Sequence, residues 1–416
     1  MRIAFWGNFG IDNFGNECTL AAIFYNMRQR IPDAEFVCIS VVPEDTARRH
    51  RIETIPMWSS ESDESGSRLM QPIRRTVKPV AEWARALRQA RGLTAVMVPG
   101  TGVLNDINEG SLGLPYNLFR WVLATRSHGG RVFFVSVGVD SVTRLLPRLL
   151  IRCALGLARR CSFRDRQSLQ RIRALGFQGA GEVFPDLAFS LPEYVPSTPL
   201  LPSRGKAVAV GIYNYRDQGR HGGVRQAYHD YVDQISSLVL WLIEHRYTAR
   251  LVIGDISGDM GVREDVRARL RARGFDLAHP AYTDEPATSY EQIMDQLASV
   301  DFVIASRFHN IVLALFLGRP VISLSYEAKI DAVMLDMGLG EYCQPLDRLD
   351  FDRLIGQFLQ LEREAPQLRS AIAERARLNR EKLERQYDLL VADLGVSPAG
   401  HAQQRPSGAE LRASGR

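Results

Sequence analysis

Short apolar runs alternate with amphipathic helical patterns along most of this chain, and this alternation constrains the fold more than any other feature. Runs of strand length lie at 2–6, 35–42, 95–98, 131–137, 161–164, 182–184, 207–212, 249–254, 301–305 and 320–325. Helical periodicity occurs at 17–30, 80–91, 116–127, 145–159, 165–175, 227–245, 262–273, 289–298, 309–317 and 328–337. Such alternation predicts mostly parallel sheets with helices on both faces.

A segment rich in proline and serine interrupts the alternation at 191–206 and predicts a linker. A chain of 416 residues suits two domains better than one. We therefore predict an α/β protein with two doubly wound, Rossmann-like domains, at 1–190 and 207–345, facing a cleft. Ligands of such sheets bind at the carboxyl ends of the strands, so the cleft is the expected site.

The C-terminal part of the chain has a different pattern. An amphipathic repeat over 346–395 predicts helices that either pack back across the first domain or mediate dimerisation. Pro366 is expected to break this repeat, because proline cannot continue the helical hydrogen-bond ladder. The polar segment 396–416 is predicted to be a disordered tail.

Composition excludes several classes of protein. No run reaches the roughly 20 apolar residues that span a bilayer, and Met1 leads straight into an apolar strand rather than a signal peptide. The five cysteines are scattered, without metal-ligand or disulfide spacing. A net charge of +5, spread along the chain, favours anionic ligands over nucleic acid. We expect a cytoplasmic protein without a metal site and with at most peripheral contact with the inner membrane face.

Candidate ligand-binding residues cluster where strands are expected to end. The turn after the first strand contains Asn13, Gly15, Asn16 and Glu17. Its glycines let the backbone approach a ligand, and the helix that follows offers free N–H groups to an anion. The spacing differs from the dinucleotide-binding fingerprint, which disfavours a nicotinamide-dependent dehydrogenase.

Two further turns in the first half carry weaker signals. Gly100, Gly102 and Asp106 follow a buried strand, where they form either a tight structural turn or a ligand loop. Arg164 ends another strand, just before Asp165, a predicted helix N-cap. Its side chain is expected either to point into the cleft or to lie on the surface beside the cap.

The most informative turn joins a buried strand to an apolar helix and carries Arg307 and His309. A helix N-terminus favours bound anions, and the arginine fork matches a carboxylate or phosphate. A histidine at this position can transfer protons near neutral pH. Glu327 and Lys329 follow the next strand, and the rarity of lysine in this chain favours ligand binding over a surface ion pair.

In their order along the chain, these motifs resemble the polysaccharide pyruvyl transferase family. The similar segments are Asn13-Phe-Gly-Asn-Glu17, Gly100-Thr-Gly-Val-Leu-Asn-Asp106, Ser136-Val-Gly138, Phe163-Arg-Asp165, Pro185-Asp-Leu-Ala-Phe189, Arg307-Phe-His309 and Ser325-Tyr-Glu-Ala-Lys329. The family usually has aspartate where this chain has Asn16, and a run of glycines where it has Pro99. These departures bear on substrate choice more than on reaction class.

The resemblance implies a fold similar to the GT-B glycosyltransferases. It also implies transfer of pyruvate from phosphoenolpyruvate to two hydroxyls of one sugar, in a polysaccharide or its lipid-linked oligosaccharide precursor, without a cofactor. We expect Arg307 to bind the donor's carboxylate or phosphate, helped by Arg164 and Lys329. His309 is expected to be the general acid or base, with Asp186 and Glu327 orienting it or the sugar.

Two other functions fit the same residues. A sugar-nucleotide glycosyltransferase of the GT-B type would also use glycine-rich turns and a basic turn to bind a nucleotide diphosphate. A non-catalytic subunit of a polysaccharide-assembly machine would tolerate the departures at Asn16 and Pro99.

Overall fold

The computed structural model describes residues 1–59, 71–106, 113–195, 206–215 and 224–396. The predicted linker at 191–206 lies mostly outside these residues, as does nearly all of the predicted tail at 396–416. None of the described helices is long and apolar enough to cross a membrane.

The first sheet has seven parallel strands in the order β3-β2-β1-β4-β5-β6-β7. Its strands are β1 (Arg2–Trp6), β2 (Glu35–Ser40), β3 (Glu53–Pro56), β4 (Ala95–Pro99), β5 (Arg131–Val137), β6 (Arg160–Phe163) and β7 (Glu182–Val183). Its helices are α1 (Phe14–Arg30), α2 (Pro43–His50), α3 (Gln71–Ala90), α4 (Leu114–Ser127), α5 (Leu145–Gly156), α6 (Arg166–Ala174) and the 3₁₀ helix η3 (Leu187–Ser190).

Strand β1 shows why both faces of this sheet are covered. Ile3 and Phe5 are buried in one hydrophobic cluster, whereas Ala4 and Trp6 are buried in another. Because successive side chains of a strand point to opposite faces, a fully apolar strand needs helices on both sides.

The second sheet has six parallel strands in the order β10-β9-β8-β11-β12-β13. Its strands are β8 (Ala207–Gly211), β9 (Thr248–Val252), β10 (Tyr282–Thr283), β11 (Phe302–Ala305), β12 (Val321–Ser325) and β13 (Cys343–Pro345). Its helices are α7 (Val224–Glu244), α8 (Ile256–Ala272), α9 (Tyr290–Ala298), α10 (Phe308–Phe316), α11 (Ala328–Asp336), η5 (Gly340–Tyr342) and η6 (Leu346–Arg348). Two parallel sheets with flanking helices confirm the predicted α/β class.

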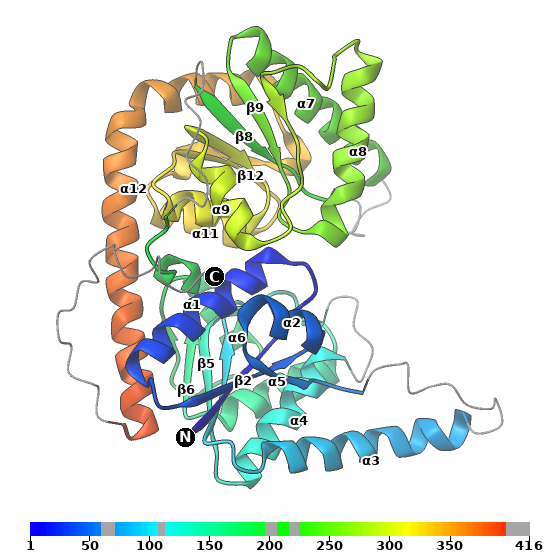
Figure 1. Cartoon of the computed structure of the whole chain (residues 1–416), viewed down its shortest axis with the longest axis vertical. Helices are drawn as coiled ribbons and strands as arrows, with labels where there is room; N and C mark the ends of the chain where they lie inside the picture. Colours follow the sequence, from blue (N-terminus) through cyan, green and yellow to red (C-terminus); the bar gives the residue numbers. More distant parts are fainter. Residues whose placement is uncertain (60–70, 107–112, 196–205, 216–223, 397–416) are drawn as a thin grey trace, which may run out of the picture.

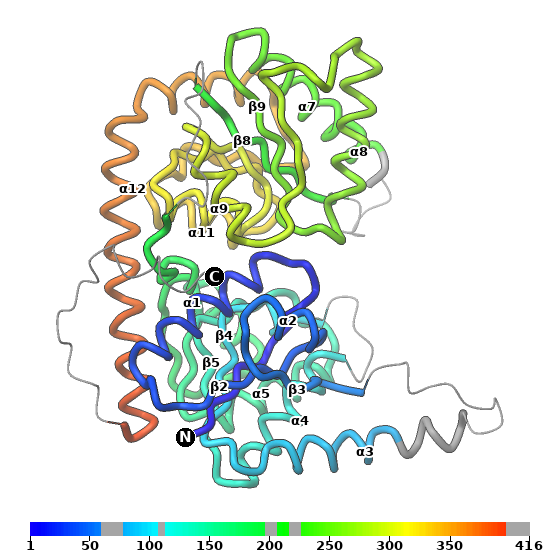
Figure 2. Tube along the Cα trace, viewed as in Figure 1, coloured from blue at the N-terminus to red at the C-terminus, as the bar shows by residue number. Residues whose placement is uncertain are grey.

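The C-terminal helix α12 (Phe351–Leu394) is continuous, so the predicted break at Pro366 is wrong. Ala365 is buried immediately before this proline and Ile372 is buried after it. This packing offsets the hydrogen bond that proline removes. Figures 1 and 2 show the helix running along the second domain, turning, and then descending beside the first.

Helix α12 ties the two domains together. Arg30 of α1 pairs with Glu384 and, at 3.0 Å, with Asp388. The hydroxyls of Tyr387 and Ser190 lie 2.7 Å apart in the buried interior. The structure therefore shows the first of the two predicted arrangements, in which the helix packs back across the N-terminal domain.

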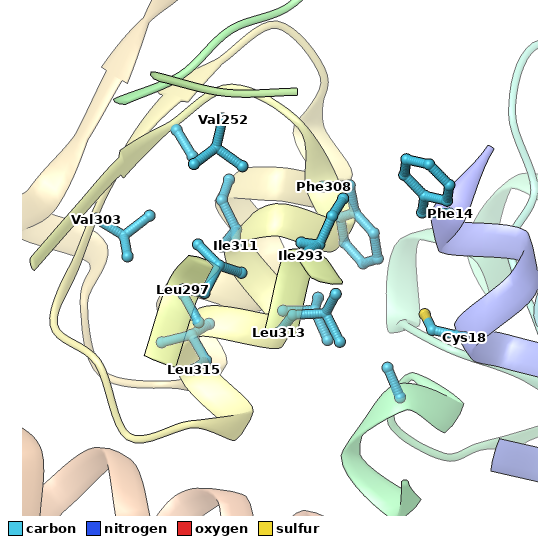
Figure 3. Close-up of a cluster of buried hydrophobic side chains, with 14 of the residues drawn as sticks. Phe14, Cys18, Val252, Ile293, Leu297, Val303, Phe308, Ile311, Leu313 and Leu315 are labelled. Atoms are coloured by element: carbon cyan, nitrogen blue, oxygen red, sulfur yellow. The ribbon is translucent and has the colours of Figure 1, made fainter. Parts of the chain in front are cut away.

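A continuous hydrophobic cluster also joins the domains. Phe14 and Cys18 of α1 face Phe308 and Leu313 of α10 (Figure 3), and all four side chains are buried. Because this contact removes apolar surface of both domains from water, it holds the first turns of α1 and α10 close together.

Each sheet has a point where the strand order reverses, between β1 and β4 in the first and between β8 and β11 in the second. At such a point neighbouring loops leave in opposite directions and open a crevice beyond the carboxyl ends of the strands. The loops after β1, β4 and β11 all begin here, so the topology places the predicted turns around one cleft.

Candidate functional site

A cavity of about 250 Å³ lies between the domains, at the carboxyl ends of both sheets. Eight of the thirteen predicted site residues line it. Its lining consists of Asn8, Ile11, Asn13, Gly15, Asn16, Gly102, Arg164, Gly254, Arg307, Phe308, His309, Asn310, Tyr326 and Lys329. The structure thus brings turns from distant parts of the chain into one site.

Arg307 is held in a fixed orientation by Asp259, a residue of α8 that is fully buried. Its Nε donates to Asp259 Oδ2 at 2.9 Å, and its Nη2 donates to Oδ1 at 2.6 Å. The guanidinium also lies over the ring of Tyr213, 4.6 Å from the centroid. This bidentate pair and the stacking leave Nη1 as the part of the fork available to a ligand.

Burial and a neighbouring charge shift the pKa of Arg307 in opposite directions. Burial alone would lower its pKa, but the carboxylate of Asp259 outweighs burial and raises the pKa above the ordinary arginine value. The guanidinium therefore stays charged in the cleft. Tyr213 in turn stacks on Tyr326, with ring centroids 3.9 Å apart, and gives the arginine a rigid aromatic wall.

His309 lies in the first turn of α10, where the peptide N–H groups have no intrahelical partner. Burial lowers its pKa from 6.5 to about 4, so the imidazole is neutral at pH 7. Its Nε2 is buried, makes no hydrogen bond, and lies 3.8 Å from Asp186 Oδ2. A buried nitrogen without a partner costs free energy, which is typical of a group reserved for a ligand.

Arg164, at the end of β6, is the other buried cation. Its Nε has no hydrogen-bond partner, and its Nη1 lies 3.7 Å from Asp186 Oδ2. The guanidinium lies over Phe308, 4.4 Å from the ring centroid. A Cβ at Gly138 would lie 2.5 Å from Arg164 Nη2, so only glycine leaves room for the arginine. Of the two predicted alternatives, the structure shows Arg164 facing the cleft.

Lys329 lines this cavity and contacts two residues, Asp140 and Glu327, that line a second cavity of about 470 Å³; Tyr326 lines both cavities. Its Nζ pairs with Glu327 and lies 3.5 Å from Asp140 Oδ1. Burial would raise the pKa of Asp140, but Lys329 and Arg164 outweigh burial and lower it. Asp140 is therefore ionised at neutral pH, and two carboxylates face the second cavity.

The turn after β1 is built around Asn13, the N-cap of α1. Its Oδ1 accepts from the N–H groups of Gly15 and Asn16 at 3.1 and 3.4 Å, and its Nδ2 donates to Asp255 of the other domain. Asn16 donates to the carbonyl of Asn8 at 2.9 Å. Asn16, which stands where the family usually has aspartate, therefore holds the loop in place at the edge of the cavity.

Five predicted site residues lie outside the cavity lining: Glu17, Gly100, Asp106, Asp186 and Glu327. Asp186 and Glu327 contact lining residues, as described above. Glu17 is buried, where it accepts from the Gly10 N–H and lies 2.7 Å from His50 Nε2.

Gly100 and Asp106 also have local structural contacts. A Cβ at Gly100 would lie 2.7 Å from the Ser136 carbonyl oxygen, so this glycine permits close packing of two strand ends. Asp106 accepts from the N–H groups of Thr143 and Arg144 at 2.9 and 2.8 Å. Both residues shape the loops that approach the cleft.

Sequence reasoning missed Asp259 and Asp140. Asp140 follows the carboxyl end of β5, the same signal that identified the other turns, but no distinctive pattern accompanies it. Asp259 lies inside a helix, where a carboxylate is normally a solvated surface group. Among the described residues, no group of three or more His, Cys, Asp or Glu side chains is arranged to hold a metal ion.

Fold and site together define a two-domain α/β protein with a basic cleft between its domains. The chain belongs to the polysaccharide pyruvyl transferase family, whose model matches residues 13–328. A search of curated proteins finds no match. Arg307, His309 and Lys329 line one cavity, which counts against the hypothesis of a non-catalytic subunit.

Solved structures with the same fold include proteins named as UDP-GlcNAc 2-epimerases and as glycosyltransferases. A Listeria monocytogenes protein provisionally named a UDP-N-acetylglucosamine 2-epimerase has a TM-score of 0.61 at 12% identity, covering 94% of this chain and 95% of its own. The Neisseria meningitidis UDP-GlcNAc 2-epimerase bound to UDP-GlcNAc has a TM-score of 0.56 at 11% identity, and the match covers 92% of this chain and 100% of the epimerase. A Rickettsia africae glycosyltransferase has a TM-score of 0.56 at 12% identity, and the match covers 95% of this chain and 99% of the glycosyltransferase. These likenesses confirm the predicted GT-B fold.

Proposed function

We propose that this protein transfers pyruvate from phosphoenolpyruvate onto two hydroxyls of a sugar, forming a cyclic ketal. The observation that carries the proposal is a cluster of buried atoms at the cleft that make no hydrogen bond, although charged groups lie within 4 Å of them: Arg164 Nε, His309 Nε2 and Asp186 Oδ2. A cation, a proton-transfer group and a carboxylate converge here without satisfying one another, as expected of a site that a charged ligand completes.

The charges of the cleft suit this donor. Phosphoenolpyruvate carries a carboxylate and a phosphate, and Arg164, Arg307 and Lys329 line the cavity. Arg307 donates two hydrogen bonds to Asp259, whereas Arg164 Nε donates none and lies 3.6 Å from Asp165 Oδ2. We therefore assign Arg164 the main contact with one anionic group. Arg307 Nη1 and the free N–H groups of α10 then bind the other.

The reaction needs proton transfer at two stages. Protonation of the donor's methylene carbon creates an oxocarbenium-like centre, which one sugar hydroxyl attacks. Phosphate leaves, and the second hydroxyl closes the ring while both hydroxyls release protons. The neutral imidazole of His309 can accept such a proton, and a bound dianion would raise its pKa so that it could also donate one. The proposed chemistry needs no metal ion or cofactor.

The second cavity is the proposed position of the acceptor sugar. Asp140 and Glu327 offer carboxylate oxygens to sugar hydroxyls there, and Lys329 lies between this cavity and the donor pocket. We propose that the acceptor belongs to an extracellular polysaccharide or to its lipid-linked precursor. Since phosphoenolpyruvate is a product of central metabolism, we place the reaction in the cytoplasm, with peripheral contact at the inner membrane face.

A direct test uses thermal unfolding and phosphate release. Phosphoenolpyruvate should raise the melting temperature, because a ligand that binds only the folded state stabilises it. Lipid-linked and nucleotide-linked sugars should then be screened for release of phosphate that depends on both substrates. The sugar-nucleotide structures with the same fold favour one alternative, a glycosyltransferase. Stabilisation by UDP-GlcNAc but not by phosphoenolpyruvate would support that alternative and contradict the proposal.

A further inference from the structure

Helix α5 of the N-terminal domain (Figure 1) exposes three leucines on one side. Leu145 is 82% exposed, Leu146 47% and Leu149 54%. Single exposed leucines are common, but three within five residues of one helix form an apolar patch in contact with water. Such a patch is costly unless another apolar phase covers it.

The segment around this patch is strongly basic. Residues 141–164 contain six arginines and no aspartate or glutamate. Several of these arginines already have carboxylate partners elsewhere: Arg144 lies 3.4 Å from Asp106, and both Arg159 and Arg160 pair with Asp393.

Three arginines of the neighbouring helices α5 and α6, namely Arg148, Arg152 and Arg173, have no such partners in the described part of the chain. Arg148 Nε donates to the Leu175 carbonyl at 3.0 Å, and Arg173 Nη1 donates to the Phe177 carbonyl at 3.1 Å. Arg152 is exposed and lies close to Gly176, on the same turn. Among the described residues, none of the three arginines lies within ion-pair distance of a carboxylate. Carbonyl groups at the end of α6 thus hold a cluster of uncompensated positive charge at the surface.

The residues whose carbonyl groups hold Arg148 also line the second cavity. Arg148 donates to the carbonyls of Ala174 and Leu175, and these two residues line that cavity together with Asp140 and Glu327. The loop that leads into α5 supplies a further part of the cavity wall. The leucine patch and the acceptor cavity are therefore adjacent parts of the N-terminal domain.

We propose that this surface, which consists of Leu145, Leu146, Leu149, Arg148, Arg152 and Arg173 and is here called the α5 face, docks on an anionic lipid bilayer. The leucines would enter the boundary between headgroups and acyl chains, while the arginines contact lipid phosphates. Charge argues against a second copy of the chain as the occupant, since pairing two α5 faces would bring six arginines together. Docking would place the second cavity at the bilayer surface, within reach of a sugar attached to a lipid.

The inference rests on the proposed function only for the identity of that lipid-linked acceptor. Its test is vesicle co-sedimentation of the full chain, without donor or acceptor, so it is independent of catalysis. We expect binding to vesicles of phosphatidylcholine with phosphatidylglycerol, weaker binding to phosphatidylcholine alone, and release by salt. Vesicle binding with no response to phosphoenolpyruvate would contradict the proposed reaction alone. The reverse result would contradict this inference and the proposed peripheral membrane contact, and would leave the proposed reaction standing.

Two sets of variants make the test specific. A Leu145→Ser/Leu146→Ser/Leu149→Ser chain should bind anionic vesicles at least about tenfold more weakly, because it loses the apolar contact. The control is Leu335→Ser/Leu378→Ser, which removes two exposed leucines of other helices and should bind like the unmodified chain.

The arginine set tests the charge. The Arg148→Gln/Arg152→Gln/Arg173→Gln chain should bind anionic vesicles at least about tenfold more weakly, and its vesicle binding should lose most of its dependence on salt. Its control removes three exposed arginines elsewhere in the same domain: Arg28, Arg88 and Arg91. If the arginine variant and its control lost vesicle binding equally, only the net charge of the protein would matter, and the inference would be overturned. Absence of binding at low salt would overturn it as well, and so would a dimer, seen by analytical ultracentrifugation, that the leucine substitutions abolish.

Discussion

The imidazole of His309 occupies the space that a side chain at Gly15 would need. A Cβ built on Gly15 would overlap the ring at Nδ1, although the two residues belong to different domains. The glycine of the first turn therefore fixes the histidine by leaving room for it. The contact also ties the position of the proposed proton-transfer group to the packing of the two domains against each other.

Gly15→Ala is expected to displace His309 and to lower kcat/KM by on the order of 10². Alanine is the better helix former, so the substitution should not unfold α1. The measurement is phosphate release, supported by the rise in melting temperature with phosphoenolpyruvate. Gly261→Ala is the matched control, because a Cβ at this helical glycine would meet no atom within 4 Å. Normal turnover by Gly15→Ala would contradict the proposed role of His309.

Arg164→Met is expected to abolish the stabilisation by phosphoenolpyruvate and to lower turnover by on the order of 10² or more. Methionine preserves much of the apolar contact with Phe308 but removes the cation. Arg166→Met, an exposed arginine two residues further on, is the control and should behave like the unmodified chain. Unchanged affinity for phosphoenolpyruvate in Arg164→Met would reassign the main anion contact to Arg307.

His309 should make the stability of the protein depend on pH between 4 and 6.5. Its pKa in the folded chain is about 4, below the ordinary 6.5, so in this window the unfolded chain binds a proton that the folded chain does not. Its contribution to stability is therefore present above pH 6.5 and lost as pH falls towards 4, by about 3 kcal/mol in all.

Denaturant unfolding of His309→Gln across this window should give a correspondingly shallower dependence of the unfolding free energy on pH. His229→Gln, at an exposed histidine, should retain the dependence of the unmodified chain. Parallel curves for all three proteins would show that His309 titrates near its ordinary pKa.

Asp259→Asn should lower the free energy of unfolding by about 3–5 kcal/mol, because it leaves the buried guanidinium of Arg307 without its carboxylate. Urea denaturation measures this loss. Asp255→Asn is the comparison, since this carboxylate lies 3.7 Å from Arg307 Nη2 and asparagine also caps a helix. Equal losses in the two variants would mean that Asp259 has no special role in holding Arg307.

The longer elements could be predicted because each satisfies a local rule. Strands such as β11 are apolar throughout, and apolar helices such as α10 are closely followed by a glycine, here Gly318. Strands β3, β10 and β13 were missed. They are short edge strands, and their stability comes from pairing with a neighbour rather than from their own pattern.

The site could be predicted in outline only. Strand ends meet at one edge of a parallel sheet, so Arg164, Arg307 and His309 could be placed near a cleft from their positions after strands. Glu17 shows the limit, because its sequence position is equally compatible with a ligand contact and with the buried pair that it forms with His50. The direction of a side chain depends on what packs around it.

The sequence by itself determined two α/β domains, the family to which the chain belongs, and the turns that could carry chemistry, because periodicity and local motifs are properties of neighbouring residues. Only the tertiary structure decided that Asp259 occupies two donors of Arg307 and that Asp140 approaches Lys329. It also decided that Arg164 Nε and His309 Nε2 make no hydrogen bond beside Asp186. These relationships join residues far apart in the chain, and they exist only because α1, α10 and α12 bury apolar surface between the domains.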